Sequence, residues 1–338
     1  MANRISLILL SAIMESKLKE LAIEILQRCP NRCIYCSSLS DLDKSNIIPF
    51  EKICQVVDDA KVLGARRICI SGGEPFLHPR IVDVVKHVAA AGLECYIYTS
   101  GIFYDGRYRS IPVELLNTVK PFVTKLIVNY ETTDAERYDV IMGTSCNGLK
   151  LLESSILSAV AAGMEVEAHF VPMHINWKDA VSVVERCKQL GVNKVSFLRL
   201  VMQGRAHENV YLTALSDDER SDFISLVKSI SIPDSDKAIR LGIPFRGNSF
   251  QCACTAGVQK ISIRYDGVVH PCESFKNDEP AGLISSKPDN IYDRRLVDIY
   301  RDSDYLAEVR GIIGEFKKMR CSESCVNQYY RCLYDKED

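Results

Sequence analysis

Short β-rich segments alternate with longer amphipathic ones from Leu21 to Leu200. The short segments predict strands, and the longer ones, with apolar residues every three or four positions, predict helices. The predicted strands are Leu21–Arg28, Arg67–Ser71, Glu94–Thr99, Lys125–Asn129, Val166–Pro172 and Lys194–Leu200. The predicted helices are Phe50–Leu63, Arg80–Ala91, Cys146–Ala162 and Lys178–Leu190, and each is followed by a glycine where a helix C-cap is expected. This alternation is typical of parallel βα units.

The pattern changes beyond the last of these strands. Residues 216–249 are polar and rich in aspartate, and they predict a helix followed by a connector. Further along, Ile261–Arg264 and Val268–His270 flank the dipeptide Asp266-Gly267, which is a strong signal for a tight turn. A β-hairpin is therefore expected in the C-terminal part of the chain.

Composition and charge narrow the class of protein. Of the 338 residues, 47% are hydrophobic and 25% are charged, as in a globular protein with a substantial core. The net charge of −2 argues against a general nucleic-acid binder, which needs a basic excess.

The N-terminus and the cysteine content predict the compartment. The apolar run from Ile5 to Met14 has no small-residue cleavage site after it and is too short to span a bilayer. Fourteen cysteines in a chain that is not secreted point to metal or cluster ligation. We expect a cytoplasmic protein that does not enter the membrane.

Three of these cysteines stand close together after the first predicted strand, in Cys29-Pro-Asn-Arg-Cys33-Ile-Tyr-Cys36. A [4Fe-4S] cluster is normally held by four thiolates, so three leave one iron open to another ligand. In βα barrels the active site lies at the carboxyl ends of the strands, where this segment falls. The remaining alternatives are three quarters of a zinc site and a chance cluster.

The spacing and the aromatic residue before the third cysteine resemble the signature of the radical S-adenosylmethionine (radical SAM) superfamily. The resemblance implies a partial βα barrel in which Cys29, Cys33 and Cys36 bind a [4Fe-4S] cluster and the open iron chelates SAM. It also implies that Tyr35 lies beside the adenine. Reduction by the cluster cleaves SAM to a 5′-deoxyadenosyl radical, which abstracts a hydrogen atom from the substrate.

A second motif follows the second predicted strand, at Gly72-Gly73-Glu74-Pro75. Paired glycines permit a close backbone approach, and a carboxylate can accept a hydrogen bond from an ammonium group. The motif resembles the GGEP segment of radical SAM proteins, whose backbone and acid hold the methionine amino group. A tight turn is the structural alternative.

Three more positions are expected to contact SAM by resemblance. Ser100 lies in a segment where relatives carry a Thr-Asn-Gly type sequence. Asn129 ends the fourth strand, and either a SAM contact or a simple cap fits it equally. Met142 stands where relatives often have an arginine for the SAM carboxylate, so Arg199 is expected to replace that cation.

The C-terminal cysteines resemble the auxiliary-cluster domains called SPASM or, in shortened form, twitch. The spacing of Gly267 and Cys272 is the specific part of the match. One auxiliary [4Fe-4S] cluster is implied, with ligands Cys254, Cys272, Cys321 and Cys325, and Cys332 as the alternative fourth ligand. A structural zinc site would use the same thiols.

Cys252 lies two residues before one of these expected ligands. A thiol near the substrate can return a hydrogen atom to a carbon radical, as in some radical SAM epimerases. A small buried apolar residue is the alternative for Cys252. The cysteines at 54, 69, 95, 146 and 187 lie on helix or strand patterns and are expected in the core.

Four parts of the chain are expected. Residues 1–20 would form a lead-in segment, 21–215 a partial (β/α)6 TIM-type barrel, 216–249 a connector, and 250–338 a small α+β auxiliary-cluster domain with a β-hairpin. Only about twenty residues precede the first strand, too few for the N-terminal peptide-recognition domain of peptide-modifying relatives.

We therefore expect a radical SAM enzyme that abstracts hydrogen from a small carbohydrate, nucleoside or natural-product substrate, in a dehydrogenation or epimerisation. A peptide or protein maturase is the first alternative. A non-catalytic iron-sulfur or zinc protein is the second, although it leaves the Gly-Gly-Glu-Pro segment unexplained. An electron donor such as flavodoxin or ferredoxin is the expected partner.

Overall fold

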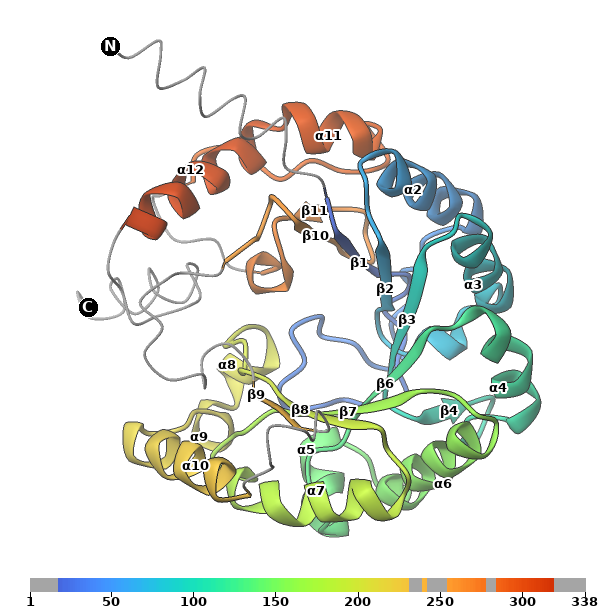
Figure 1. The fold of residues 1–338 in the computed structure, drawn as a ribbon, viewed down its shortest axis with the longest axis vertical. Coiled ribbons are helices and arrows are strands. Elements are labelled where there is room, and N and C mark those ends of the chain that lie inside the picture. The colour runs from blue at the N-terminus through green and yellow to red at the C-terminus, as the bar shows by residue number, and fades with distance from the viewer. Residues whose placement is uncertain (1–17, 231–238, 242–253, 278–283, 319–338) are drawn as a thin grey trace.

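Within the described residues, eight parallel strands and one antiparallel strand form a single sheet that curves into an open ring with helices outside it (Figure 1). The computed structural model describes residues 18–230, 239–241, 254–277 and 284–318. The strand order is β11-β10-β1-β2-β3-β6-β7-β8-β9. The predicted parallel α/β barrel is confirmed.

All six predicted strands are present. In chain order they are β1 (Glu20–Glu24), β2 (Arg67–Ser71), β3 (Glu94–Thr99), β6 (Lys125–Asn129), β7 (Val166–Phe170) and β8 (Lys194–Phe197). β1, β7 and β8 end earlier than predicted. At the end of β7, for example, the amide of Val171 donates to the Glu131 side chain instead of to a neighbouring strand. A seventh strand, β9 (Ile239–Leu241), pairs with β8 from within the predicted connector.

The four predicted helices are also present and lie outside the ring (Figure 1). They are α2 (Phe50–Val62), α3 (Ile81–Ala90), α6 (Gly148–Ala161) and α7 (Ala180–Gln189), and α10 (Asp217–Ser229) is the helix expected before the connector. The unpredicted elements in this part of the chain are short: the hairpin β4 (Ile102–Tyr104) and β5 (Tyr108–Ser110), and the helices α4 (Val113–Val119), α5 (Ala135–Met142), α8 (Arg205–Glu208) and α9 (Val210–Thr213).

The predicted C-terminal hairpin consists of β10 (Lys260–Ile263) and β11 (Val269–His270). β10 also pairs in parallel with β1, with Leu21 opposite Ile261, so the hairpin continues the barrel sheet beyond its first strand. The sequence did not predict this pairing. The division of the chain into a barrel and an auxiliary domain stays a prediction.

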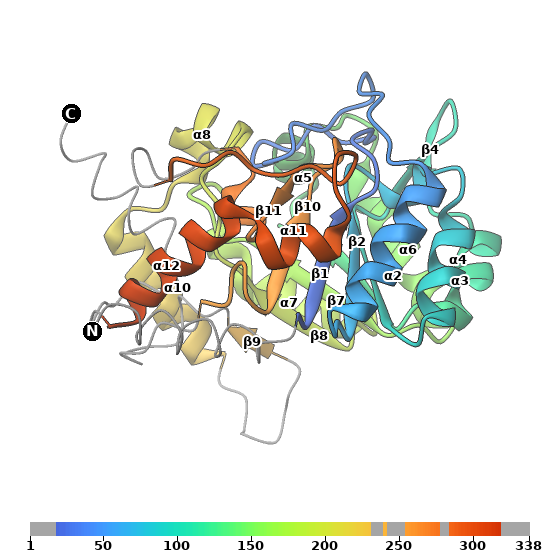
Figure 2. The same ribbon diagram turned by 90° about the horizontal axis from the view of Figure 1, so that it is seen from above.

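Two further helices that were not predicted, α11 (Leu296–Asp302) and α12 (Asp304–Lys318), follow the hairpin. α11 lies beside α2, and α12 continues beyond α11 on the side away from α2 (Figures 1 and 2). Arg295 binds the buried carboxylate of Asp59 on α2 and so holds the start of α11 against the barrel. No helix in the described ranges is both long enough and apolar enough to cross a membrane.

Candidate active site

A long loop between β1 and α2, residues 25–48, carries the three clustered cysteines; we call it the cluster loop. Its backbone is held by the end of α5, because the amide of Arg32 donates to the Met142 carbonyl at 3.0 Å and the amide of Ile34 to the Ile141 carbonyl at 2.9 Å. The unpredicted helix α5 is thus a support of the cysteine segment.

Two of the three thiols, those of Cys29 and Cys33, lie in a desolvated site. Burial raises the pKa of Cys29, and nearby Cys33, Glu74 and Cys36 raise it further. Burial also raises the pKa of Cys33, with a further contribution from Cys36, while the Arg205 guanidinium acts in the opposite direction. Thiolates gathered away from water need a positive partner, and iron ions of a cluster provide one.

Arg205 fastens the cluster loop from the other side of the barrel. Its side chain is buried, and Nε donates to the Cys33 carbonyl at 2.8 Å while a terminal nitrogen donates to the Ser40 carbonyl at 2.6 Å. Gly204 approaches so closely that a Cβ there would lie 2.7 Å from the Cys36 carbonyl oxygen. The sequence did not assign Arg205 a role.

Gly72 and Gly73 bring the end of β2 directly against the start of the cluster loop. An added Cβ would lie 2.3 Å from the Leu26 carbonyl oxygen at Gly72 and 2.0 Å from the Arg28 carbonyl oxygen at Gly73. Gly72 also has a φ of 141°, which favours glycine. These contacts explain why two glycines occur in succession here.

Glu74 is fully buried, and its carboxylate accepts hydrogen bonds only from protein groups among the described residues. The donors are the Thr99 hydroxyl at 2.7 Å, the Ser100 amide and hydroxyl at 2.8 and 2.6 Å, and the Phe76 amide at 3.3 Å. Ser100 is therefore joined to the Gly-Gly-Glu-Pro segment as the sequence suggested. These four donors hold the Glu74 carboxylate in place. The contact of Glu74 with the methionine amino group stays a prediction.

A second buried carboxylate, Glu131, lies beneath Tyr35. The Tyr35 hydroxyl donates to Oε1 of Glu131 at 2.8 Å, Asn129 approaches the same oxygen at 3.4 Å, and the Val171 amide donates to Oε2 at 2.8 Å. Burial raises the pKa of Glu131 to about 7. Sequence reasoning considered Asn129 but overlooked Glu131, although a charged residue two positions beyond a buried strand is a signal for a site at the barrel mouth.

Met142, which was expected where relatives often have an arginine, lies beside the cysteines. Its sulfur is 3.8 Å from the sulfur of Cys33 and 3.9 Å from the Tyr35 hydroxyl, and the side chain is buried. Arg199 follows β8, across the ring from β1 (Figure 1), and is half-buried. Its assignment to the SAM carboxylate stays a prediction.

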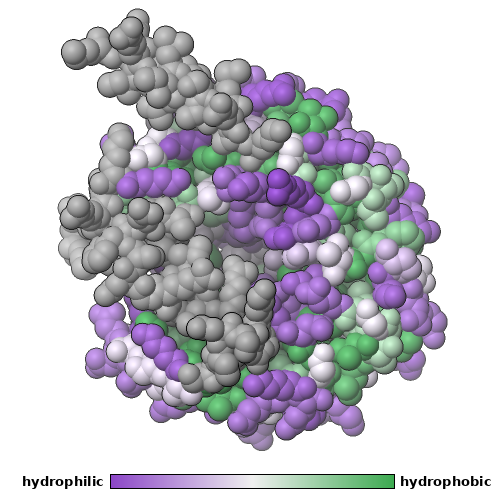
Figure 3. Space-filling view, viewed as in Figure 1, coloured by the Kyte–Doolittle hydropathy of each residue, from purple (hydrophilic) through white to green (hydrophobic). Residues whose placement is uncertain are grey.

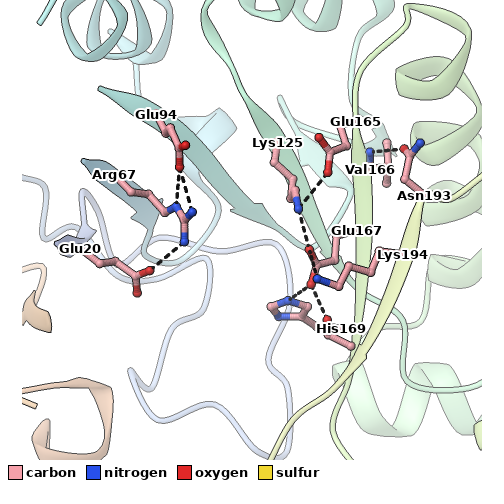
Figure 4. A network of polar contacts seen from close by, with 11 residues as sticks. Glu20, Arg67, Glu94, Lys125, Glu165, Val166, Glu167, His169, Asn193 and Lys194 are labelled. Atoms are coloured by element: carbon pink, nitrogen blue, oxygen red, sulfur yellow. Dashed lines mark hydrogen bonds and ion pairs between the residues drawn. The ribbon is translucent and has the colours of Figure 1, made fainter. Parts of the chain in front are cut away.

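Charged side chains gather toward the amino ends of the strands, where Arg67, Glu94 and Lys125 are the first residues of β2, β3 and β6. Figure 4 shows charged side chains of neighbouring strands pointing toward one another. Arg67 lies between Glu94 and Glu20, and Glu167 accepts hydrogen bonds from Lys125 at 3.0 Å and from Ser196. His169 is 3.3 Å from the same carboxylate. In the space-filling view of Figure 3, hydrophilic residues surround a hollow near the middle of the ring.

The residues present fit a cluster with an open iron. The donor set is three thiols, and beside them both side-chain polar atoms of buried Asn31 have no partner within the described residues. An unsatisfied buried amide is rare in proteins and fits a site that a bound group completes. No three described His, Cys, Asp or Glu side chains converge as ligands of one metal ion would. A cubane, in contrast, binds its thiolates at separate irons.

Two of the expected auxiliary-cluster ligands, Cys254 and Cys272, lie within the described residues. Cys254 and Cys272 are half-buried, and the Gly257 amide donates to the Pro271 carbonyl at 2.9 Å, so the chain beyond Cys254 lies against the chain before Cys272. Cys252, Cys321, Cys325 and Cys332 lie outside the described residues.

Comparison with known proteins agrees with this site. The model of the Radical SAM superfamily matches residues 23–214. A probable GTP 3',8-cyclase of Methanothermobacter thermautotrophicus is 30% identical over 180 residues, which are 51% of this chain and 54% of that protein. A PqqA peptide cyclase of Methylobacterium nodulans is 25% identical over 86% of this chain and 75% of its own length.

Among solved structures, Streptococcus suis SuiB bound to S-adenosylmethionine superposes with a TM-score of 0.69 at 16% identity, over 88% of this chain and 68% of that one. The chain belongs to the radical SAM superfamily. It is a radical SAM enzyme, and its cofactors are accordingly a [4Fe-4S] cluster and SAM.

Proposed function

We propose that Cys29, Cys33 and Cys36 hold the catalytic cluster, and that the enzyme abstracts hydrogen from a polar substrate inside the barrel. The observation that carries this proposal is that Cys29, Cys33 and Cys36 lie in one loop fastened by the glycine pair, by α5 and by Arg205, with Cys29 and Cys33 desolvated. The loop follows β1, so it lies at the carboxyl ends of the strands, where barrel active sites occur.

When bound, the cluster supplies the electron that cleaves SAM to the 5′-deoxyadenosyl radical. The protein binds and orients SAM and the substrate, and it excludes water from the site. The backbone at Gly72 and Gly73 and the Glu74 carboxylate are proposed to contact the methionine amino group, and the hydrogen bonds of Glu74 to Thr99 and Ser100 hold this turn against the end of β3. Tyr35, whose hydroxyl is held by Glu131, is proposed to lie beside the adenine. Asn129 and Arg199 are proposed as further polar contacts to SAM.

Polar residues at the barrel mouth support a substrate with many hydrogen-bonding groups. We favour a small carbohydrate, nucleoside or natural-product intermediate, because polar residues toward the carboxyl ends of the strands, such as Asn129 and His169, suit hydroxyl, amide or phosphate groups. The relative named GTP 3',8-cyclase supports this class. A peptide substrate is the second candidate, and it is favoured by the relative named PqqA peptide cyclase, which matches more of the chain.

The reaction outcome is proposed as dehydrogenation or epimerisation, whereas both of these relatives are named cyclases. All three outcomes begin with loss of one substrate hydrogen. An auxiliary cluster at Cys254, Cys272, Cys321 and Cys325 or Cys332, a hydrogen-donating Cys252, and a flavodoxin or ferredoxin as electron donor belong to the same proposal.

Anaerobic reconstitution tests the proposal. We expect about eight irons per chain for two cubanes, and 5′-deoxyadenosine on adding SAM and a reductant. Replacing Cys29, Cys33 and Cys36 together by alanine should remove about half of the iron and all SAM cleavage. Cleavage that survives this replacement would refute the ligand assignment. Deuterium transfer into 5′-deoxyadenosine from labelled nucleotides, sugars or peptides then distinguishes the substrate classes.

A further inference from the structure

The segment that follows Cys272 runs along the cluster loop. The Asn277 side chain donates to the Ser37 carbonyl, and Lys276 donates to the Ser38 hydroxyl. The same segment is also held by Gln203, beyond β8, whose side chain donates to the Ser274 carbonyl. Residues from the C-terminal hairpin region and from the cluster loop, far apart in sequence, therefore share hydrogen bonds within a few residues of Cys36.

Lys276 is the charged residue at this junction. Its side chain is 7% exposed, and Nζ lies 2.6 Å from Oε1 of Glu24 and 3.0 Å from the Ser38 hydroxyl. Glu24 ends β1 and is equally buried. Its second oxygen, Oε2, has no hydrogen-bond partner within the described residues. The pair is thus a buried ion pair, not a surface contact.

The ammonium group keeps its charge in this position. Burial alone would lower the pKa of Lys276, but Glu24, Glu273 and Cys36 act against it and the pKa lies above its ordinary value. Ser38, whose hydroxyl lies 3.0 Å from Nζ, is two residues after Cys36, so the ammonium group lies near the cysteine segment. Two positions before Lys276, Ser274 is fixed to Gln203, which places Lys276 on a tethered segment.

We propose that Lys276 is a positioning residue for the cluster, and that its positive charge makes the cluster bound at Cys29, Cys33 and Cys36 easier to reduce. This inference rests on the ligand assignment proposed above. Because Lys276 lies four residues after Cys272, it makes the C-terminal segment part of the environment in which the first cluster accepts its electron.

The physical basis is the change of charge on reduction. Adding an electron makes the cluster and its three thiolates more negative, and a nearby cation in a poorly hydrated site stabilises that state. Loss of the cation should therefore shift the reduction potential to more negative values. A lysine in solvent would have little effect, because water and salt screen its charge.

The test is a redox titration of anaerobically reconstituted enzyme, followed by the electron paramagnetic resonance signal that changes on adding SAM. We expect Lys276→Met to lower the equilibrium constant for reduction of the cluster about tenfold, which is a negative shift of the reduction potential by about 59 mV for a one-electron couple. Lys276→Arg keeps the charge and should restore the potential. Lys44→Met removes a cluster-loop lysine whose side chain is 39% exposed, and it should leave the potential unchanged.

A second pair of variants covers the case in which Lys276→Met leaves Glu24 buried without a partner and prevents folding. Glu24→Gln and the double variant Glu24→Gln/Lys276→Met differ only in the lysine, and the double variant buries no unpaired charge. The double variant should have the more negative potential of the two. Equal potentials within this pair would overturn the inference.

The two proposals fail in different ways. If the SAM-responsive signal survives in the triple alanine variant of Cys29, Cys33 and Cys36, the ligand assignment is wrong. If that variant loses the signal while Lys276 has no effect on the potential in either background, only the role of Lys276 is refuted.

Discussion

The hydroxyl of Tyr35 donates a 2.8 Å hydrogen bond to Oε1 of the buried Glu131. This bond joins the cluster loop to the chain just beyond β6, and the opposite oxygen of Glu131 extends the connection to the Val171 amide beyond β7. One carboxylate thus fixes an aromatic ring beside the cysteines relative to two strands of the barrel. The connection costs free energy, because the carboxylate has no exposed surface.

The raised pKa of Glu131 predicts a pH dependence of stability. The unfolded chain releases this proton near 4.5 and the folded chain near 7, so stability from this group is present below 4.5 and is lost as the pH rises to about 7. The interval corresponds to roughly 3 kcal/mol at 1.36 kcal/mol per pH unit. Glu131→Gln should remove the pH dependence of stability that comes from this group. The free energy of unfolding of the variant should therefore increase relative to that of the parent as the pH rises.

Urea unfolding from pH 4.5 to 7.5 measures the difference between the two proteins. Glu185→Gln, at an exposed position, is the control and should give a difference that does not change with pH. A difference for Glu131→Gln that is equally flat would show that Glu131 is ionised in the folded protein throughout this range.

The glycine pair predicts a severe steric effect. Gly73→Ala places a Cβ 2.0 Å from the Arg28 carbonyl oxygen, which belongs to the backbone of the cluster loop and cannot rotate away. We expect a loss of several kcal/mol in the free energy of unfolding, by the overpacking that such contacts cause. Thermal and urea unfolding measure it.

Gly311→Ala is the matched control, since Gly311 lies in α12 with open space at the Cβ position. The same substitution there should stabilise the protein by about 1 kcal/mol, because alanine favours helix over glycine. If both variants shift stability in the same direction and by similar amounts, the close approach of Gly73 is not what requires glycine.

The local hydrophobic pattern of the sequence predicted many of the barrel strands and helices. β2, β3 and β6 begin and end at the predicted residues, because strands of a parallel sheet are short apolar runs bounded by turns. α5 escaped prediction since eight residues hold too little periodicity. The pairing of β10 with β1 joins residues 20–23 to 260–263, and no local pattern encodes a contact across such a distance in the chain.

The site shows the same division. Each of the two motifs is a short local stretch of sequence, so the sequence alone could predict both. They are the three cysteines at 29, 33 and 36 and the Gly-Gly-Glu-Pro segment at 72–75. Glu131 and Lys276 were missed because their importance comes from what the fold brings to them: a tyrosine from the cluster loop in one case, and the end of β1 in the other.

The buried hydrogen bonds of Ser155 predict that its replacement lowers stability. It is buried on α6, where its hydroxyl donates to the Gly101 carbonyl at 2.6 Å and accepts from the Ile111 amide at 2.8 Å. Ser155→Ala leaves both backbone groups unsatisfied and should cost about 2 kcal/mol or more of unfolding free energy. Ser225→Ala, at an exposed position in α10, should instead be neutral or slightly stabilising. A neutral result at Ser155 would mean that water replaces its hydroxyl.

We expect the amount of iron-sulfur cluster bound to depend on the two hydrogen bonds of the Arg205 guanidinium and not only on its positive charge. Two of its nitrogens bind carbonyls of the cluster loop, at Cys33 and Ser40, and its own amide donates to the Cys36 carbonyl at 3.2 Å. Lysine keeps the charge but offers a single ammonium group, which cannot bind both carbonyls in this geometry. We expect Arg205→Lys to retain fewer irons after anaerobic reconstitution and to give a weaker SAM-responsive signal.

Arg186→Lys makes the same chemical change at a paired arginine far from the cysteines in sequence. Arg186 binds both oxygens of Glu153 between α6 and α7, so its replacement should leave iron content unchanged. Iron and sulfide per chain, measured for both variants, separate a general loss of an arginine contact from a loss at the cluster loop. Full iron content in Arg205→Lys would show that the glycine pair and α5 hold the loop without Arg205.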